Sequence, residues 1–107
     1  MNDTPALQFL SFEASDDTDG RFTFDALASV RPGQRAALET EASAIQAWVR
    51  SLGLSGPGPL DEGHDWDEDL LWQVEGQGDA AWHTLSLTYT GTAALADALH
   101  QLLDDGA

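Results

Sequence analysis

The stretch DEGHDWDED, Asp61–Asp69, divides the sequence into two halves that show the same order of predicted elements. Six of its nine residues are acidic, and a segment rich in Gly and Pro, residues 54–60, precedes it directly. Because glycine and proline interrupt helices and inner strands, residues 54–69 are predicted to form a Gly/Pro linker followed by an acidic loop. On each side of this stretch the hydrophobic pattern indicates two strands and then one helix.

In the first half, Arg21–Val30 is the clearest strand, since its apolar and polar residues alternate as in an antiparallel strand with one buried face. Leu7–Glu13 is apolar and aromatic and predicts a strand as well, although its alternation is poor. Between them, Ala14–Gly20 has the Asp, Ser and Gly residues of a turn. Residues 31–52 repeat apolar side chains at helical spacing, with Glu41 outside the apolar stripe.

The second half repeats this order. Leu70–Glu75 and Trp82–Thr90 predict two strands joined by a glycine-containing turn, and Thr92 is placed to cap a final helix with its side chain. The predicted fold is α+β, a two-layer sandwich in which a four-stranded antiparallel sheet carries two helices on one face in the order ββαββα. Residues 1–107 are expected to form a single domain, with residues 1–5 as a loose N-terminus.

Charge is the strongest signal in the composition. Nineteen acidic residues face four arginines and no lysine, which gives a net charge of −15, and every arginine precedes Ser51. Phosphate contacts need clustered Lys or Arg, so direct binding to nucleic acid or to an anionic membrane is not expected. The charge favours a basic protein partner or a cation, and the simpler alternative is that the acids only keep the domain soluble.

The chain contains no cysteine, which excludes a disulfide framework and a thiolate metal site. Its first residues, MNDTPALQFLSF, lack the basic region and the long apolar core of a signal peptide. No apolar run approaches the ~18 residues of a membrane span. We therefore expect a cytoplasmic protein that is not inserted into a membrane.

Motifs that would indicate catalysis or metal binding are incomplete. Asp65, Asp67 and Asp69 alternate as at the start of a calcium loop, but Leu70 stands where that loop needs Gly and Gly76 where it needs Glu. There is no Cys or Lys nucleophile and no Gly-x-Ser-x-Gly motif. The histidines have no metal-ligand spacing: His64, His83 and His100. No catalytic residue, metal site or cofactor is predicted.

The leading hypothesis is a non-catalytic interaction protein that binds a basic protein partner through its acidic surface. Antitoxins, immunity proteins and DNA mimics are similar in charge and size only, not in sequence. In this hypothesis Trp66 is an exposed aromatic anchor amid charge. The predicted partner-binding residues are Asp61, Glu62, Asp65, Trp66, Asp67, Glu68 and Asp69.

Two alternatives from other classes stay open. The first is a small metal- or ligand-dependent enzyme that uses the acidic loop and a histidine. The second is a homodimer of unknown role, formed through the sheet face that no helix covers. By alternation three apolar side chains share that face, and together they define a candidate interface: Leu27, Leu71 and Trp82. Because two acidic copies repel each other, a monomer or a weak homodimer is expected.

Overall fold

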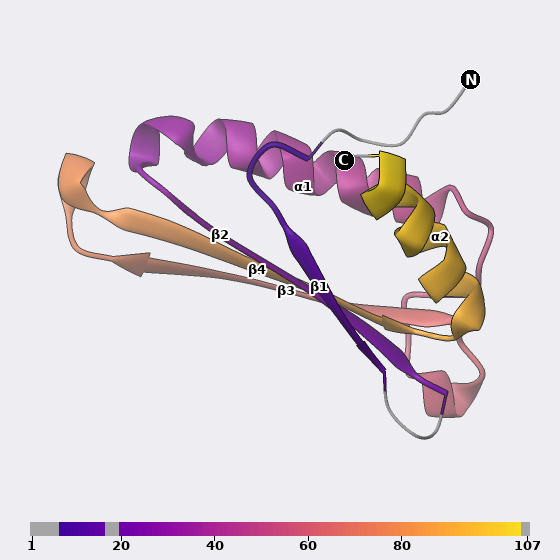
Figure 1. The fold of residues 1–107 in the computed structure, drawn as a ribbon. Helices are drawn as coiled ribbons and strands as arrows, with labels where there is room; N and C mark the ends of the chain where they lie inside the picture. The colour runs from indigo at the N-terminus through magenta and orange to yellow at the C-terminus, as the bar shows by residue number, and fades with distance from the viewer. Residues whose placement is uncertain (1–6, 17–19, 106–107) are drawn as a thin grey trace.

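The computed structural model describes residues 7–16 and 20–105 and shows a four-stranded antiparallel sheet with two helices on one face (Figure 1). The α+β class and the ββαββα order predicted from the sequence are confirmed. The predicted loose N-terminus, residues 1–5, lies outside the described residues. The strands and helices are β1 (Phe12–Asp16), β2 (Phe22–Val30), α1 (Arg35–Arg50), β3 (Trp66–Glu75), β4 (Trp82–Gly91) and α2 (Ala93–Asp105).

The two halves of the chain meet in the middle of the sheet, whose strand order is β1-β2-β4-β3. β2 pairs with β4 along its whole length, from Phe22 opposite Gly91 to Val30 opposite His83. β3 pairs with all ten residues of β4, whereas β1 pairs with only Phe22–Ala26 of β2. Each half therefore contributes one inner strand and one edge strand.

Alternation along the strands decides which side chains enter the core. Positions of β2 and β4 that face the helices are buried except for Phe22 and His83 near the strand ends, which are half-buried, and the positions between them are exposed or half-buried. Burial of one Leu or Phe side chain stabilises the fold by roughly 1.5–3 kcal/mol, so this layer contributes much of the stability. The largest fully buried side chains are Trp66, Tyr89, Phe24, Leu38, Ile45, Leu85, Leu87, Leu95, Leu99, Leu102 and Val49.

The first helix is shorter than its predicted span of residues 31–52. A 3-10 turn, Pro32–Gln34, comes first, and the α-helix occupies Arg35–Arg50. Proline fits this turn because its missing N–H would have no partner there. The chain then turns at Gly53, whose φ of +77° lies in the left-handed region that glycine adopts readily.

The predicted strand Leu7–Glu13 is wrong for most of its length. β1 begins at Phe12 and includes Ala14–Asp16, which were predicted to be part of a turn, while residues 7–10 leave the sheet. The carboxylate of Glu41 on α1 accepts the backbone N–H groups of residues 8–10 at donor–acceptor distances of 2.5–3.2 Å. Glu41 lies outside the apolar stripe, yet its side chain is buried, with only 8% exposed. It holds the N-terminal segment against α1.

The predicted side-chain cap of α2 is also wrong. The backbone of Thr92 accepts the N–H of Ala96 and donates to the carbonyl of Asp65. Its hydroxyl is buried and has no hydrogen-bond partner among the described residues. The start of α2 is therefore held to the chain before β3 by the main chain rather than by a capping hydroxyl.

Candidate functional site

The acidic stretch is not one loop. Leu60–Glu62 forms a 3-10 turn that ends at Gly63, and β3 begins at Trp66, so the predicted loop over residues 54–69 is wrong at its C-terminal end. Acidic residues are uncommon in strands because they seldom find a buried partner there. Here the full-length pairing with β4 draws Trp66–Asp69 into the sheet.

Trp66 is buried rather than exposed, and its predicted role as a surface anchor is wrong. Its side chain is 0% exposed, its ring centroid lies 5.9 Å from that of Tyr89, and its indole N–H donates to the carbonyl of Leu54. Gly56 in the Gly/Pro linker approaches so closely that a Cβ there would collide with Trp66. Alternation turns Trp66 toward the core and leaves the carboxylates on either side outside it.

The carboxylates of the stretch separate into different environments. Asp61 pairs with Arg21, whereas the side chain of Asp65 accepts the backbone N–H of Ser55 at 3.1 Å. Glu62 is exposed. Asp67 and Asp69 are two residues apart on β3, so both lie on the face of the sheet that no helix covers. We call this the open face. The structure therefore does not bring the predicted partner-binding residues together in one patch.

Glu68 points the other way, into a polar network beneath α1. The phenol of Tyr89 donates to Oε1 of Glu68 at 2.7 Å, and Gln46 and Arg50 donate to Oε2 at 3.2 and 3.4 Å. Burial raises the pKa of Tyr89 above its usual range, and the hydrogen bond to Glu68 and the charge of Glu68 raise it further. Arg50 opposes this rise. The network ties β3 and β4 to α1 and leaves Glu68 only slightly exposed.

The four arginines are all engaged within the chain. Arg21 pairs with Asp61, and the other three also lie over tryptophan rings, with guanidinium-to-centroid distances of 3.8–5.8 Å. Such stacking places the cation against the negative face of the ring. The stacked pairs are Arg31 with Trp82, Arg35 with Trp72 and Arg50 with Trp66.

The strands themselves contain acidic residues but neither Lys nor Arg. None of the four strands, as the structure describes them, includes Lys or Arg. Strand alternation and register place several hydroxyl groups on the open face, and Thr88 donates to Asp25 at 2.7 Å there. The open-face carboxylates are Glu13, Asp25, Asp67, Asp69 and Glu75.

Register places like charges side by side in the middle of the open face. Glu13 lies directly opposite Asp25, Asp25 opposite Thr88, and Thr88 opposite Asp69. Like charges directly opposite on neighbouring strands are destabilising. Sequence reasoning missed Glu13 and Asp25 as site residues, because they lie far from the acidic stretch in the chain. Alternation in the strand Arg21–Val30 does place Asp25 on the polar face, but no signal in the sequence paired Glu13 with it.

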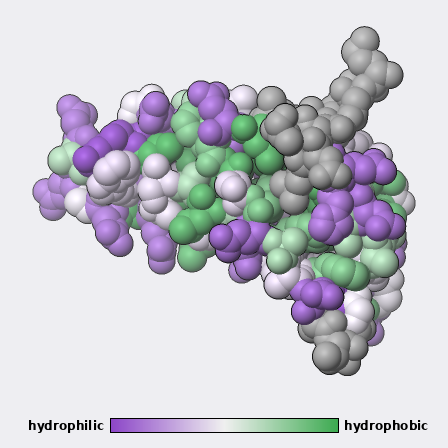
Figure 2. Space-filling model, viewed as in Figure 1, coloured by the Kyte–Doolittle hydropathy of each residue, from purple (hydrophilic) through white to green (hydrophobic). Residues whose placement is uncertain are grey.

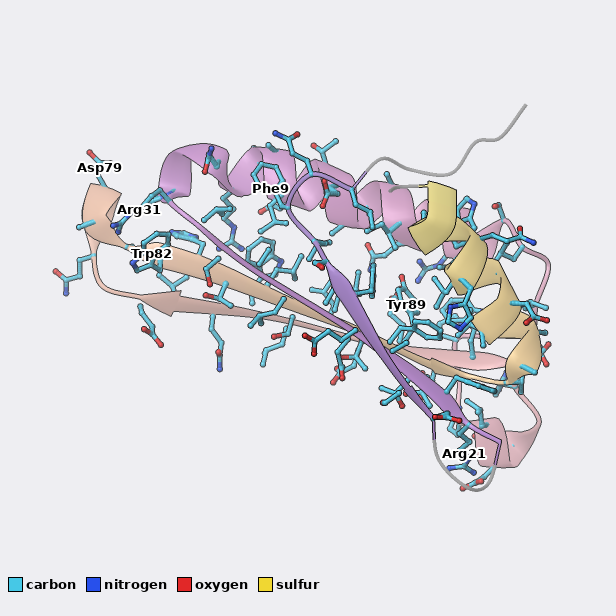
Figure 3. All side chains as sticks on the ribbon, viewed as in Figure 1. Phe9, Arg21, Arg31, Asp79, Trp82 and Tyr89 are labelled. Atoms are coloured by element: carbon cyan, nitrogen blue, oxygen red, sulfur yellow. The ribbon has the colours of Figure 1, made fainter. Side chains whose placement is uncertain are left out.

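The predicted apolar interface is only partly assembled. Leu27 and Leu71 lie opposite Ser86 from its two sides, and they are 63% and 51% exposed. Trp82 lies four residues from Ser86 on β4, roughly 13 Å away at the usual strand rise. It is 44% exposed and stacks with Arg31 beside Asp79 at the hairpin tip (Figure 3). Leu27 and Leu71 thus form a small apolar centre from which Trp82 is separate.

A shallow depression of about 500 Å³ lies beside this centre on the open face. In the side view of Figure 2, hydrophobic residues gather in the middle of the molecule and hydrophilic ones cover the end with the hairpin tip. The lining of the depression combines apolar side chains with carboxylate and hydroxyl groups. It is lined by Ser11, Glu13, Asp25, Ala26, Leu27, Ser86 and Thr88.

The histidines lie apart and each has its own partner. His64 lies 3.2 Å from the hydroxyl of Ser55, and Nδ1 of His83 accepts a hydrogen bond of 2.8 Å from Arg35. His100 is exposed on α2 and meets the ring of Phe24 edge-on. Within residues 7–16 and 20–105, no group of three or more His, Cys, Asp or Glu side chains is placed to hold a metal ion.

Neither helix in the described part of the chain has the length and hydropathy of a membrane span. Comparisons of the chain with protein-family models, with curated proteins and with solved structures found no match.

Proposed function

We propose that this protein is a non-catalytic binding protein whose ligand is a positively charged protein surface, held on the open face of the sheet. The observation that carries the proposal is the row Glu13–Asp25–Thr88–Asp69, which places three carboxylates across adjacent strands that contain no Lys or Arg. Such an arrangement costs stability in the free protein. A basic partner would neutralise it.

The internal use of the arginines supports the same proposal. Each of the four is held by a carboxylate, a carbonyl or a tryptophan ring elsewhere in the molecule. The open-face carboxylates are therefore available to cations from outside. A field of one sign increases the rate of encounter with a partner of opposite sign and makes that rate fall with salt.

The centre of the face suits a protein better than a simple ion. Leu27 and Leu71 are more than half exposed. They lie on either side of Ser86, which is the one residue between them across the sheet. An apolar centre with a charged rim is typical of protein interfaces. We infer that the basic surface bound here also has apolar side chains, as in the nucleic-acid-binding surfaces that a DNA mimic occludes.

A homodimer through the same face is the less favoured alternative. Two copies would bring the open-face carboxylates of both into one interface, and the apolar centre consists of only two leucines. A small enzyme that uses the acidic stretch and a histidine is the other alternative. It is less supported, because His64 and His83 hydrogen-bond to Ser55 and Arg35 rather than to a carboxylate.

The proposal is tested by affinity capture from the source cell with three immobilised proteins. The first is the wild type, the second carries Asp25→Asn and Asp69→Asn on the open face, and the third carries Asp79→Asn and Asp97→Asn elsewhere. The two variants change the net charge equally, and Asp79 and Asp97 are exposed residues outside the open face. Each captured protein is then purified, and its dissociation constant is measured at low and high salt.

The expected result is a basic protein that the wild type and the third protein retain, that the open-face variant loses, and whose dissociation constant rises with salt. The double open-face change is expected to weaken binding about tenfold, since each exposed charge pair contributes up to about 1 kcal/mol. Equal retention by all three proteins, or no basic protein retained by any, would show that the open face is not the binding surface.

A further inference from the structure

β2 is longer than the strand that covers its outer side. β1 pairs with Phe22–Ala26, whereas β2 continues to Val30. Among the residues that the structure describes, none pairs with the outer edge of residues 27–30. Successive residues of a strand direct their backbone groups to opposite neighbours, so alternate residues of this segment present N–H and C=O groups at an unpaired edge.

Residues 8–10 of the chain are held away from this edge. If β1 continued toward the N-terminus, its next residues would pair with Leu27 and those beyond. Instead the N–H groups of residues 8–10 bind the carboxylate of Glu41 on α1, and Phe9 lies beside that helix in Figure 3. A buried carboxylate that accepts three backbone N–H groups is a strong attachment. Within the described residues, therefore, no segment continues the line of β1 beyond Phe12 toward the N-terminus.

The depression on the open face lies at this point. Its lining includes Ser11, which immediately precedes β1, and Leu27 at the start of the unpaired edge, with the carboxylates of Glu13 and Asp25 beside them. Leu27 is the most exposed of the large hydrophobic side chains, at 63%. An extended segment in the line of β1 would thus find backbone partners, a contact for an apolar side chain, and two carboxylates for a cationic one.

We propose that the outer edge of residues 27–30 receives an extended, basic segment of the protein partner, which pairs with β2 as an added strand. The inference rests on the proposed function and specifies how the partner binds. The backbone of the segment supplies affinity, and its side chains supply specificity, as in other recognition by strand addition. On the open face its side chains alternate with the strand period. An Arg or Lys opposite Leu27 lies diagonal to Asp25 and in line with Glu13, and an apolar residue opposite Ser29 lies diagonal to Leu27.

The probe for this inference is a short acetylated peptide of sequence RTVTRTVT, whose Arg and Val side chains share one face of a strand. Two N-methylated forms are compared with it, one methylated at the Thr amides and one at the Arg and Val amides. An added strand pairs through one edge only. The expected result is that one methylated form binds like the unmodified peptide and the other loses at least tenfold in affinity.

Amide hydrogen exchange locates the peptide on the protein. The edge-directed amides of residues 27–30 are expected to become at least tenfold slower when the peptide binds, while those of residues 70–75 on the outer edge of β3 stay unchanged. The variant Glu13→Gln with Asp25→Asn is expected to bind the peptide about tenfold more weakly. The matched variant Asp79→Asn with Asp97→Asn is expected to bind it like the wild type.

Equal binding of the two methylated forms, or unchanged exchange at residues 27–30, would overturn strand addition and leave charge-driven docking on the open face intact. Slower exchange at residues 70–75 would show that the peptide pairs with β3 instead of β2, and this result would also overturn the inference. No binding of any peptide would overturn it as well. The capture experiment decides the proposed function separately, because it requires only a basic surface and not an extended segment.

Discussion

The phenol of Tyr89 and the carboxylate of Glu68 are joined by a hydrogen bond of 2.7 Å beneath α1. Tyr89 is the chain's only tyrosine, and there is no lysine or cysteine. Between about pH 9 and pH 12, therefore, Tyr89 is the one side chain whose ordinary pKa lies in the range. The pair consequently dominates the response of this fold to alkali.

We predict that the free energy of unfolding falls as the pH rises above about 10. The folded state keeps the proton on Tyr89 because its pKa is raised, whereas the unfolded chain loses it near the ordinary value of about 10. The folded state then binds more protons, and stability declines by about 1.4 kcal/mol per pH unit. Below pH 10 both states are protonated and no dependence arises from this group.

Urea denaturation at several alkaline pH values, in wild type and in Tyr89→Phe, measures this effect. The variant should lack the additional decline above pH 10. Absorbance of tyrosinate should appear in the wild type only together with unfolding. Tyrosinate formation in the folded protein, near pH 10, would contradict the predicted environment of Tyr89.

A second prediction concerns the acidic row of the open face. Asp25→Asn should stabilise the free protein by about 0.5 kcal/mol, because it removes a like-charge pair with Glu13 and keeps an acceptor for Thr88. The gain should shrink at moderate salt, where the Debye length is about 10 Å or less. Thermal unfolding of wild type and variant in low and moderate salt measures both effects. A destabilised variant at low salt would mean that Asp25 is held mainly by attractive contacts.

The third prediction compares two tryptophans. Trp66→Ala should cost about 3–5 kcal/mol, because the side chain is fully buried against Tyr89 and beneath the Gly/Pro linker. Trp82→Ala should cost less than half of that, since Trp82 is 44% exposed at the hairpin tip. Urea midpoints of the two variants give the difference directly. Similar losses would show that the tip carries more of the stability than its exposure indicates.

The fourth prediction tests the attachment of the N-terminal segment. Glu41→Ala should cost about 3 kcal/mol, because three backbone N–H groups lose a charged acceptor in a site that water reaches poorly. The amides of residues 8–10 should then exchange rapidly while those of β4 stay protected. Glu39→Ala on the same helix is the control, since Glu39 is exposed and its ion pair with Arg35 lies within one turn of the helix. Unchanged exchange at residues 8–10 would show that another group holds the segment.

Much of the fold was predictable because local patterns and the final packing agree. β2 and β4 alternate cleanly, and in both strands the residues predicted to share a face do share it. The errors arose where tertiary contacts override local preference. Leu7–Leu10 is apolar enough for a strand but packs beside α1, and Trp66–Asp69 is too acidic for a typical strand but pairs with β4.

The candidate site was less predictable for a physical reason. Leu27 and Leu71 were correctly placed by alternation, because which face a side chain occupies is a local property of a strand. That Glu13, Asp25 and Asp69 form one row depends on strand order and register, which bring together residues from three strands. A concentration of acids in the sequence, such as Asp61–Asp69, is therefore a poor guide to a concentration of acids in space.

The pairing of β2 with β4 also governs how this chain can fold. Each residue pair in that seam is separated by more than fifty positions along the chain, from Val30 with His83 to Phe22 with Gly91. Contacts of such long sequence separation require the closure of a large loop before they stabilise anything, and they slow folding. Neither half can complete its own core, because its inner strand, β2 or β4, needs the inner strand of the other half as its pairing partner. A chain cut in the Gly/Pro linker would therefore yield two fragments that gain structure only by association.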